Sequence, residues 1–220
     1  MELTDFVRYF TIMDVCRLHQ DWNEWRGSGT FSTTSPEIVY ISVCETSSLD
    51  ICLVQPTRRG DASQTAVDLC VGVVRCGDTD NSPQTVVEFS GRSLLTSVTC
   101  STLVSPGTYM IVPMSFLASP DHSGTATPPD HSDTTTPPAR YTLVCYADKN
   151  WCVWEGVGAV DLVAQVLYKV TESKGEARDA LHGCSVYQLN KKIAGLVIAV
   201  ENRNPHRYIT GVFYLTGETL

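Results

Sequence analysis

The stretch EIVYISVCETSSLDICLVQP, from Glu37 to Pro56, contains two apolar runs that decide the fold class. The runs EIVYISVCE (37–45) and LDICLVQP (49–56) are rich in Val, Ile and Tyr and are separated by a short polar segment. β-Branched and aromatic residues favour extended backbone, and small polar residues between such runs mark a turn. The pattern therefore predicts two consecutive β-strands.

Runs of the same kind recur along the chain as far as residue 155. They lie at 66–76, 84–90, 94–103, 107–116 and 141–148. The segments between them, such as GDTDNSP and SPG, carry the Gly, Pro, Asp and Asn residues that are typical of turns. Short strands at this spacing predict a mainly β protein with an antiparallel β-sandwich.

The segment 117–140 interrupts this pattern. It contains PDHSGTATP (120–128), followed directly by the near-duplicate PDHSDTTTP (129–137). A tract of Pro, Ser, Thr and Asp buries too little apolar surface to fold, so the sequence predicts a disordered insertion here. The repeated His and Asp residues have metal-ligand chemistry, but a flexible tract does not pre-position ligands, and slippage in a tolerant loop explains the repeat.

A helical pattern follows Asp161. The apolar residues of DLVAQVLYKV share one helical face, with Asp161 as the expected N-cap and Gly175 just beyond the expected end. That face consists of Leu162, Val163, Val166, Leu167 and Val170. Three further strands are expected at 184–190, 194–204 and 208–215. We therefore expect a sandwich domain at 1–160 and, at 161–220, a helix with the start of a second, incomplete β-module.

Composition limits the function classes. The chain has 220 residues, of which 43% are hydrophobic, and its net charge is −8. This acidic balance argues against nucleic acid as a partner. No apolar run reaches the length of about 18 residues that would span a bilayer. The charged N-terminal decapeptide is also not a secretory signal.

The sequence contains nine cysteines, most of them in apolar runs such as ISVCE and DLCVGV. Their number is odd, and no export signal precedes them. Buried thiols of a reducing compartment are therefore favoured over a disulfide framework, which predicts a cytoplasmic protein.

Cys16 and His19 have the chemistry of a nucleophile and its base. The run before Cys16 resembles a strand, however, and residues three apart in a strand point to opposite faces. A helix would bring them together. The sequence offers no orienting carboxamide for His19 and no oxyanion loop. The structural interpretation is therefore favoured, and a free-standing cysteine hydrolase remains an alternative.

Trp22, Trp25 and Arg26 precede Gly27-Ser28-Gly29, which suggests a short turn that carries two indoles and a guanidinium. Large aromatic side chains with a polar tip are typical anchors of interfaces. The turn could clamp the sandwich to a neighbouring domain, or Trp22 could cap the end of the sandwich itself. Under both interpretations, this segment joins domains and does not perform chemistry.

Two loops offer weaker candidates. Asp78, Asp80 and Asn81 supply oxygen atoms at a loop tip that could bind calcium, although an ordinary solvated turn explains them as well. Arg58 and Arg59 could meet an acidic partner or a phosphate, although an isolated basic pair is more often a solvated turn.

Both ends of the chain resemble a known family. DFVRYFTIMDVCRLHQDWNEWR (5–26) resembles the junction at which a calpain protease core runs into its β-sandwich domain, the domain III. LYKVTESKGEAR (167–178) and GCSVYQLNKKIAGLVIAVENRNPHRYI (183–209) resemble the C-terminal homology region of the small optic lobes calpains. The middle of the chain resembles the family only weakly.

The resemblance implies a non-catalytic region of an intracellular cysteine protease. Its sandwich would brace a papain-like core, located upstream of Met1, and offer a surface to a protein substrate or regulator. The chain contains neither the nucleophile segment nor the histidine segment of such a core, and no EF-hand loop. The resemblance therefore implies no cofactor, and calcium binding is only weakly supported. A calcium- or phospholipid-binding sandwich is the first alternative.

Overall fold

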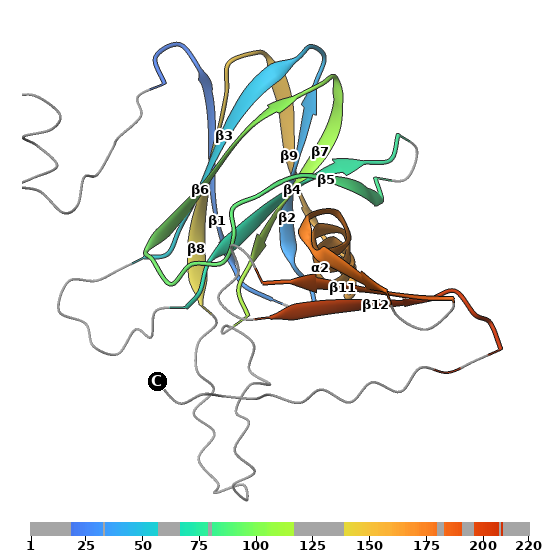
Figure 1. Ribbon diagram of the computed structural model, residues 1–220. Coiled ribbons are helices and arrows are strands. Elements are labelled where there is room, and N and C mark those ends of the chain that lie inside the picture. The colour runs from blue at the N-terminus through green and yellow to red at the C-terminus, as the bar shows by residue number, and fades with distance from the viewer. Residues whose placement is uncertain are drawn as a thin grey trace, which may run out of the picture.

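The computed structural model describes residues 19–32, 34–56, 67–78, 81–116, 139–179, 183–190, 196–206 and 208. Two antiparallel sheets pack face to face (Figure 1). The first sheet has the order β1 (Asn23–Thr30), β8 (Arg140–Ala147), β3 (Ser47–Val54), β6 (Ser97–Val104). The second has the order β5 (Pro83–Phe89), β4 (Cys70–Cys76), β7 (Gly107–Met114), β2 (Glu37–Val43), β9 (Trp151–Val157). The prediction of a mainly β protein with antiparallel sheets is confirmed.

Strand β3 illustrates why these residues form a sandwich. Side chains alternate between the two faces of a strand, and those of Leu49, Ile51 and Leu53 point into the core with at most 1% of their surface exposed. Asp50 and Cys52 point outward from the same strand. Each buried aliphatic side chain stabilises the fold by about 1.5–3 kcal/mol relative to leaving it exposed.

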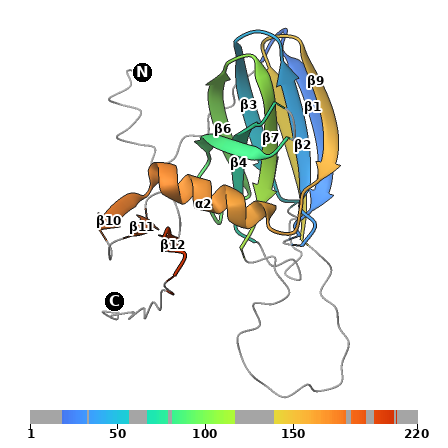
Figure 2. The ribbon, with the colours of Figure 1, turned by 90° about the vertical axis from the view of Figure 1, so that its right-hand side faces the viewer.

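The middle strands of the second sheet are buried on both faces. Its inner face joins the sandwich core, and helix α2 (Leu162–Lys174) lies across its outer face (Figure 2). Leu162, Val166 and Val170 of the helix are buried against this outer face, so the predicted apolar helix face is confirmed. Burial on both faces explains why β4, CVGVVRC, is apolar along most of its length.

Helix α2 begins and ends at the predicted positions, but the predicted N-cap side chain does not bond to the backbone. Asp161 occupies the N-cap position, yet its carboxylate accepts a hydrogen bond from Gln165 Nε2 at 2.7 Å and caps no backbone N–H group. The helix ends at Gly175, whose backbone is extended, and a Cβ at this position would collide with the Thr171 carbonyl oxygen, which favours glycine there. In the described part of the chain, no helix is both long and apolar enough to cross a bilayer.

A small third sheet follows the helix, in the order β10 (Glu176–Asp179), β11 (Cys184–Leu189), β12 (Val197–Asn202). β11 and β12 match predicted strands, whereas β10 was not predicted. The third predicted strand, 208–215, lies outside the described residues apart from Tyr208. The domain division at 160/161 stays a prediction, but α2 shares one buried cluster with the second sheet and with Leu189.

The prediction of a short turn at Trp22–Arg26 is wrong. Trp25 and Arg26 lie within β1, which pairs with β8 in continuous register from Asn23 opposite Ala147 to Thr30 opposite Arg140. Glycine is unfavourable inside a strand by propensity, so Gly27 and Gly29 suggested a turn. They belong to the strand because neighbouring side chains occupy the space where their own would lie.

Hydrogen bonds also join chain segments close to the ends of strands. Gln55 and Val67 form a reciprocal pair, since Gln55 Nε2 donates to the Val67 carbonyl at 2.9 Å and Val67 N–H donates to Gln55 Oε1 at 3.0 Å. Phe31 N–H donates to the Ala139 carbonyl at 3.0 Å. Most of the predicted insertion at 117–140 lies outside the described residues, and Arg140 is already part of β8.

Asp68 forms a further group of hydrogen bonds, which is buried. Its carboxylate accepts hydrogen bonds from Arg92 Nε at 2.6 Å, Ser115 Oγ at 2.9 Å and Phe116 N–H at 3.1 Å. The Asp68 side chain is fully buried, so these donors offset the cost of removing a charge from water. The end of the segment after β7 is thereby fastened to the residues before β4.

Candidate functional site

The inner face of β1 carries a tryptophan followed by two glycines. Trp25, Gly27 and Gly29 lie opposite the inward-pointing Cys145, Leu143 and Tyr141 of β8. A Cβ added at Gly27 would lie 2.5 Å from Cη2 of the Trp25 indole, so the indole lies along the strand over this glycine. The alternation of the strand thus leaves a hollow beside a half-buried tryptophan.

The opposite wall of this hollow comes from the second sheet. Glu37 of β2 lies opposite Val157 of β9, and Val39 lies opposite Glu155. Together the two walls enclose a groove of about 360 Å³, which we name the Trp25 groove. It is lined by Trp25, Gly27, Ser28, Glu37, Ile38, Val39, Tyr141, Leu143, Glu155, Gly156 and Val157. Because β1 and β9 are the outer strands of their sheets, the groove lies at the open side of the sandwich.

Polar contacts hold Glu37 at the rim of the groove. Thr30 donates to the Glu37 carboxylate from its N–H and from its hydroxyl, both at 3.3 Å. Burial raises the pKa of Tyr141, and the charge of Glu37, the hydrogen bond to Glu37 and the charge of Glu155 raise it further. Tyr141 therefore stays neutral, and its hydroxyl donates to Glu37.

Neither carboxylate of the groove has a basic partner among the described residues. The ion pairs found there join other groups, and none involves Glu37 or Glu155. Two acidic side chains thus face a hollow whose other walls are aromatic or aliphatic. Such an arrangement suits a positively charged group with an apolar stem.

The three residues predicted as one interface lie on different faces. Trp25 points into the groove, whereas Arg26 points outward, where its guanidinium donates to Glu24 Oε1 at 3.0 and 3.1 Å. This hydrogen bond, together with the charge of Glu24, raises the pKa of Arg26. Trp22 precedes the strand and stacks on His19 at a centroid distance of 4.1 Å. Of the three, the groove contains Trp25 alone.

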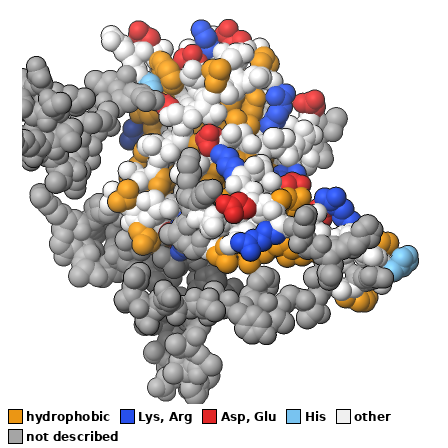
Figure 3. All heavy atoms as spheres, viewed as in Figure 1, with side chains coloured by type: hydrophobic (Ala, Val, Ile, Leu, Met, Phe, Trp, Pro, Cys, Tyr) orange, Lys and Arg blue, Asp and Glu red, His pale blue; other side chains and the backbone are white. Residues whose placement is uncertain are grey.

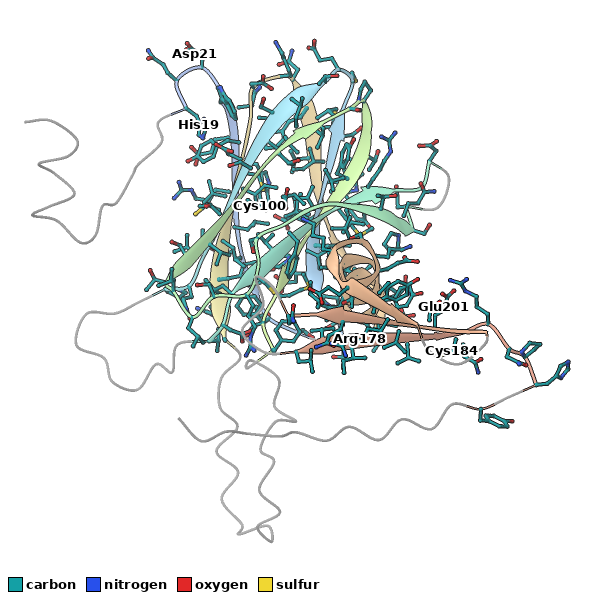
Figure 4. The ribbon with its side chains drawn as sticks, viewed as in Figure 1. His19, Asp21, Cys100, Arg178, Cys184 and Glu201 are labelled. Carbon is teal, nitrogen blue, oxygen red and sulfur yellow. The ribbon has the colours of Figure 1, made fainter. Side chains whose placement is uncertain are left out.

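His19 lies next to the start of β1, close to the turn at Asp21 (Figure 4). Its Nε2 lies 2.7 Å from Oδ2 of Asp50, and its ring also contacts Tyr146 at a centroid distance of 5.0 Å. Cys16 lies outside the described residues. The contacts of His19 are those of a side chain that fastens the start of β1 to the outer face of the first sheet.

The other predicted sites gain no support from the geometry. Asp78 is exposed, Asn81 has a left-handed backbone with φ of 52°, and Asp80 lies outside the described residues. Within the described ranges, no group of three or more His, Cys, Asp or Glu side chains could hold a metal ion. Arg58 and Arg59 also lie outside these ranges. Basic and acidic side chains are interspersed over the described part of the face in Figure 3.

Most of the described cysteines are buried or partly buried thiols, whereas Cys44 and Cys152 are exposed. No disulfide joins any two of the eight cysteines in the described part of the chain. Burial raises the pKa of Cys70 and of Cys145, so both remain protonated and unreactive as nucleophiles. The buried Cys100 lies in the sandwich interior (Figure 4).

Sequence reasoning missed Glu37, Tyr141 and Glu155, which belong to three different strands. The signal that could have revealed the groove is the W-x-G-x-G pattern from Trp25 to Gly29, in which alternate positions lose their side chains on one face. Comparison with models of known protein families finds no family that matches this chain.

Proposed function

We propose that this chain is a non-catalytic interaction region of a calpain-type cytoplasmic cysteine protease, and that the Trp25 groove receives part of the protease core. The resemblance of residues 5–26, 167–178 and 183–209 to the small optic lobes calpains supports the family. The groove supports the interaction, because it places a half-buried indole at the open side of a sandwich.

The observation that carries the proposal is the position of Trp25. The segment before β1 is the one that would connect to a core, and Trp25 follows it as the third residue of β1. Aromatic side chains in pockets dominate the energy of protein interfaces. A half-buried tryptophan beside a hollow has apolar surface left to bury against such a partner.

The test is association of the purified chain with a separately expressed papain-like core of the parent protein, measured by isothermal titration calorimetry. Trp25→Ala should weaken association about thirtyfold, because truncation of an interface anchor costs about 2 kcal/mol or more. Circular dichroism should show that the variant remains folded.

Trp154→Ala is the matched control. Trp154 is also partly exposed, but it lies on the outer face of β9, where it stacks on Tyr40 at a centroid distance of 5.3 Å. Equal weakening by both substitutions would show a non-specific effect. Unfolding of the Trp25→Ala chain would place the indole in the structural core and end the docking proposal.

A further inference from the structure

We infer that the Trp25 groove binds a lysine or arginine side chain from a partner segment that runs in extended conformation along the edge of β1. The inference rests on the proposed function in taking the groove as an interaction surface. It adds the chemical class of the occupant and the direction from which it enters.

Charge favours a cationic occupant. Glu37 and Glu155 stand on the second-sheet wall of the groove, without a basic partner among the described residues. A cation between them would form charge-assisted hydrogen bonds, which are shorter and stronger than neutral ones. The net charge of −8 would add long-range attraction for a basic segment.

The remaining walls fit the stem of such a side chain. Trp25 and Tyr141 supply aromatic surface, while Leu143 and Val39 supply aliphatic surface. Lysine and arginine bury their methylene groups along apolar surface and keep the charged head near polar groups. Aromatic rings also attract a cation directly. A volume of about 360 Å³ is at the lower end of ligand pockets, which suits one long side chain better than a cofactor.

The edge of β1 provides the route of entry. β1 pairs with β8 on one side, and among the described residues no strand pairs with its other side. In an antiparallel pair, backbone N–H and C=O groups of alternate residues point away from the partner strand, so this edge can receive an added strand.

The groove lies between two edge strands, β1 of the first sheet and β9 of the second. At the inward positions of β1 beyond Trp25, the Trp25 indole fills the space over Gly27, and Glu37 and Tyr141 fill the space over Gly29. The inward positions of β9 near the groove hold Glu155 and Val157, which already occupy that space. An inward side chain of a strand added to β1 would therefore lie beside the Trp25 indole, Tyr141 and the Glu37 carboxylate.

The probe is the blocked heptapeptide Thr-Val-Thr-Lys-Thr-Val-Thr, with a twin that carries norleucine in place of lysine. Titration into the ¹⁵N-labelled full chain should shift the Trp25 indole resonance and the backbone amides of β1 saturably. The norleucine twin should bind about fivefold more weakly or worse, because it lacks the charge. Binding of the lysine peptide should also weaken with salt.

Two glutamate variants locate the site. Glu155→Gln should weaken binding of the lysine peptide about fivefold, because the charge-assisted contact is lost. Glu24→Gln, on the outward face of β1, should change it less than about twofold. Retained amide spectra in the free variants would show that neither change unfolds the chain.

Three outcomes would overturn the inference: equal binding of the norleucine twin, equal effects of the two glutamate variants, or no saturable shift. A fourth arm uses spermidine. If spermidine reproduces all shifts, including those of the β1 amides, the groove is a site for free amines and not for an extended segment. Failure of the proposed function is separate, since it would appear as unchanged core association in the Trp25→Ala chain.

Discussion

Gly27 shows how a missing side chain shapes the groove. A methyl group at this position would lie 2.5 Å from the Trp25 indole, closer than real contacts permit, so either the ring or the strand would have to move. The glycine costs some strand propensity, by less than about 1 kcal/mol, yet it allows a large aromatic ring to lie flat along its own strand. The position of Trp25 therefore depends on the residue two places further on.

Gly27→Ala should destabilise the fold by about 1–3 kcal/mol, the usual cost of overpacking. The same substitution made in a Trp25→Ala chain should cost almost nothing, because the colliding ring is gone. Urea unfolding of the four chains gives this double-mutant cycle directly. Ser28→Ala, on the opposite face of β1, is the control and should change stability by less than about 0.5 kcal/mol. Equal costs in both backgrounds would contradict the packing of the indole over Gly27.

The groove could not be assembled from the sequence for a physical reason. Glu37, Tyr141 and Glu155 are far apart along the chain, and they meet only through the register of β1 with β8 and of β2 with β9. Propensity also pointed in the wrong direction at Gly27 and Gly29, where close packing outweighs the local preference for a turn. Contacts that depend on strand register leave no pattern in the local sequence.

Secondary-structure elements were predictable where a period repeats. The alternation in β3 and the helical face of α2 are local patterns, and each strand or helix buries the residues that the pattern selects. β10 was missed because its four residues, EARD, contain no apolar alternation. Its pairing with β11 is a tertiary contact, which the local sequence does not encode.

Helix α2 should contribute to the stability of the sandwich, because its apolar face covers the outer face of the second sheet. Val166→Asp places a charge in this buried cluster and should destabilise the whole fold by several kcal/mol, since an unpaired buried charge is costly. Thermal unfolding followed by circular dichroism would measure the effect.

Ala164→Asp is the matched change on the exposed face of the same helix, and it should have little effect. Amide hydrogen exchange in β4 and β7 shows whether the helix unfolds independently of the sheet or together with it. If Val166→Asp leaves exchange in these strands unchanged, the helix belongs to an independent module. Faster exchange there shows that sheet and helix unfold together.

At the scale of the whole molecule, buried thiol and phenol groups make the stability of the fold decrease at high pH. Burial raises the pKa of Cys70 and Cys145 above 9.0 and that of Tyr141 above 10.0, the values for exposed groups. Above these values the unfolded chain binds fewer protons than the native chain, so the free energy of unfolding falls as pH rises. Below them, all three groups are protonated in both states and contribute no dependence on pH.

Urea midpoints measured under reducing conditions should therefore be unaffected by these groups around pH 7–8 and fall between about pH 9 and pH 10.5. Cys145→Ala removes one of the groups and should make this decline shallower, whatever it does to stability at neutral pH. Cys44→Ala, at an exposed position, should leave the slope unchanged. A midpoint that stays constant up to pH 10.5 would contradict the burial of these groups.

Protein engineering can use the hydrogen bonds that join Gln55 to Val67, Phe31 to Ala139, and Asp68 to its neighbours. Each holds the chain by hydrogen bonds close to the end of a strand. The sheets therefore keep their anchoring points whatever the length of chain between Phe116 and Ala139. A fluorescent label or affinity tag inserted between the two near-identical nonapeptides, at residues 128 and 129, is therefore expected to leave the two sheets folded.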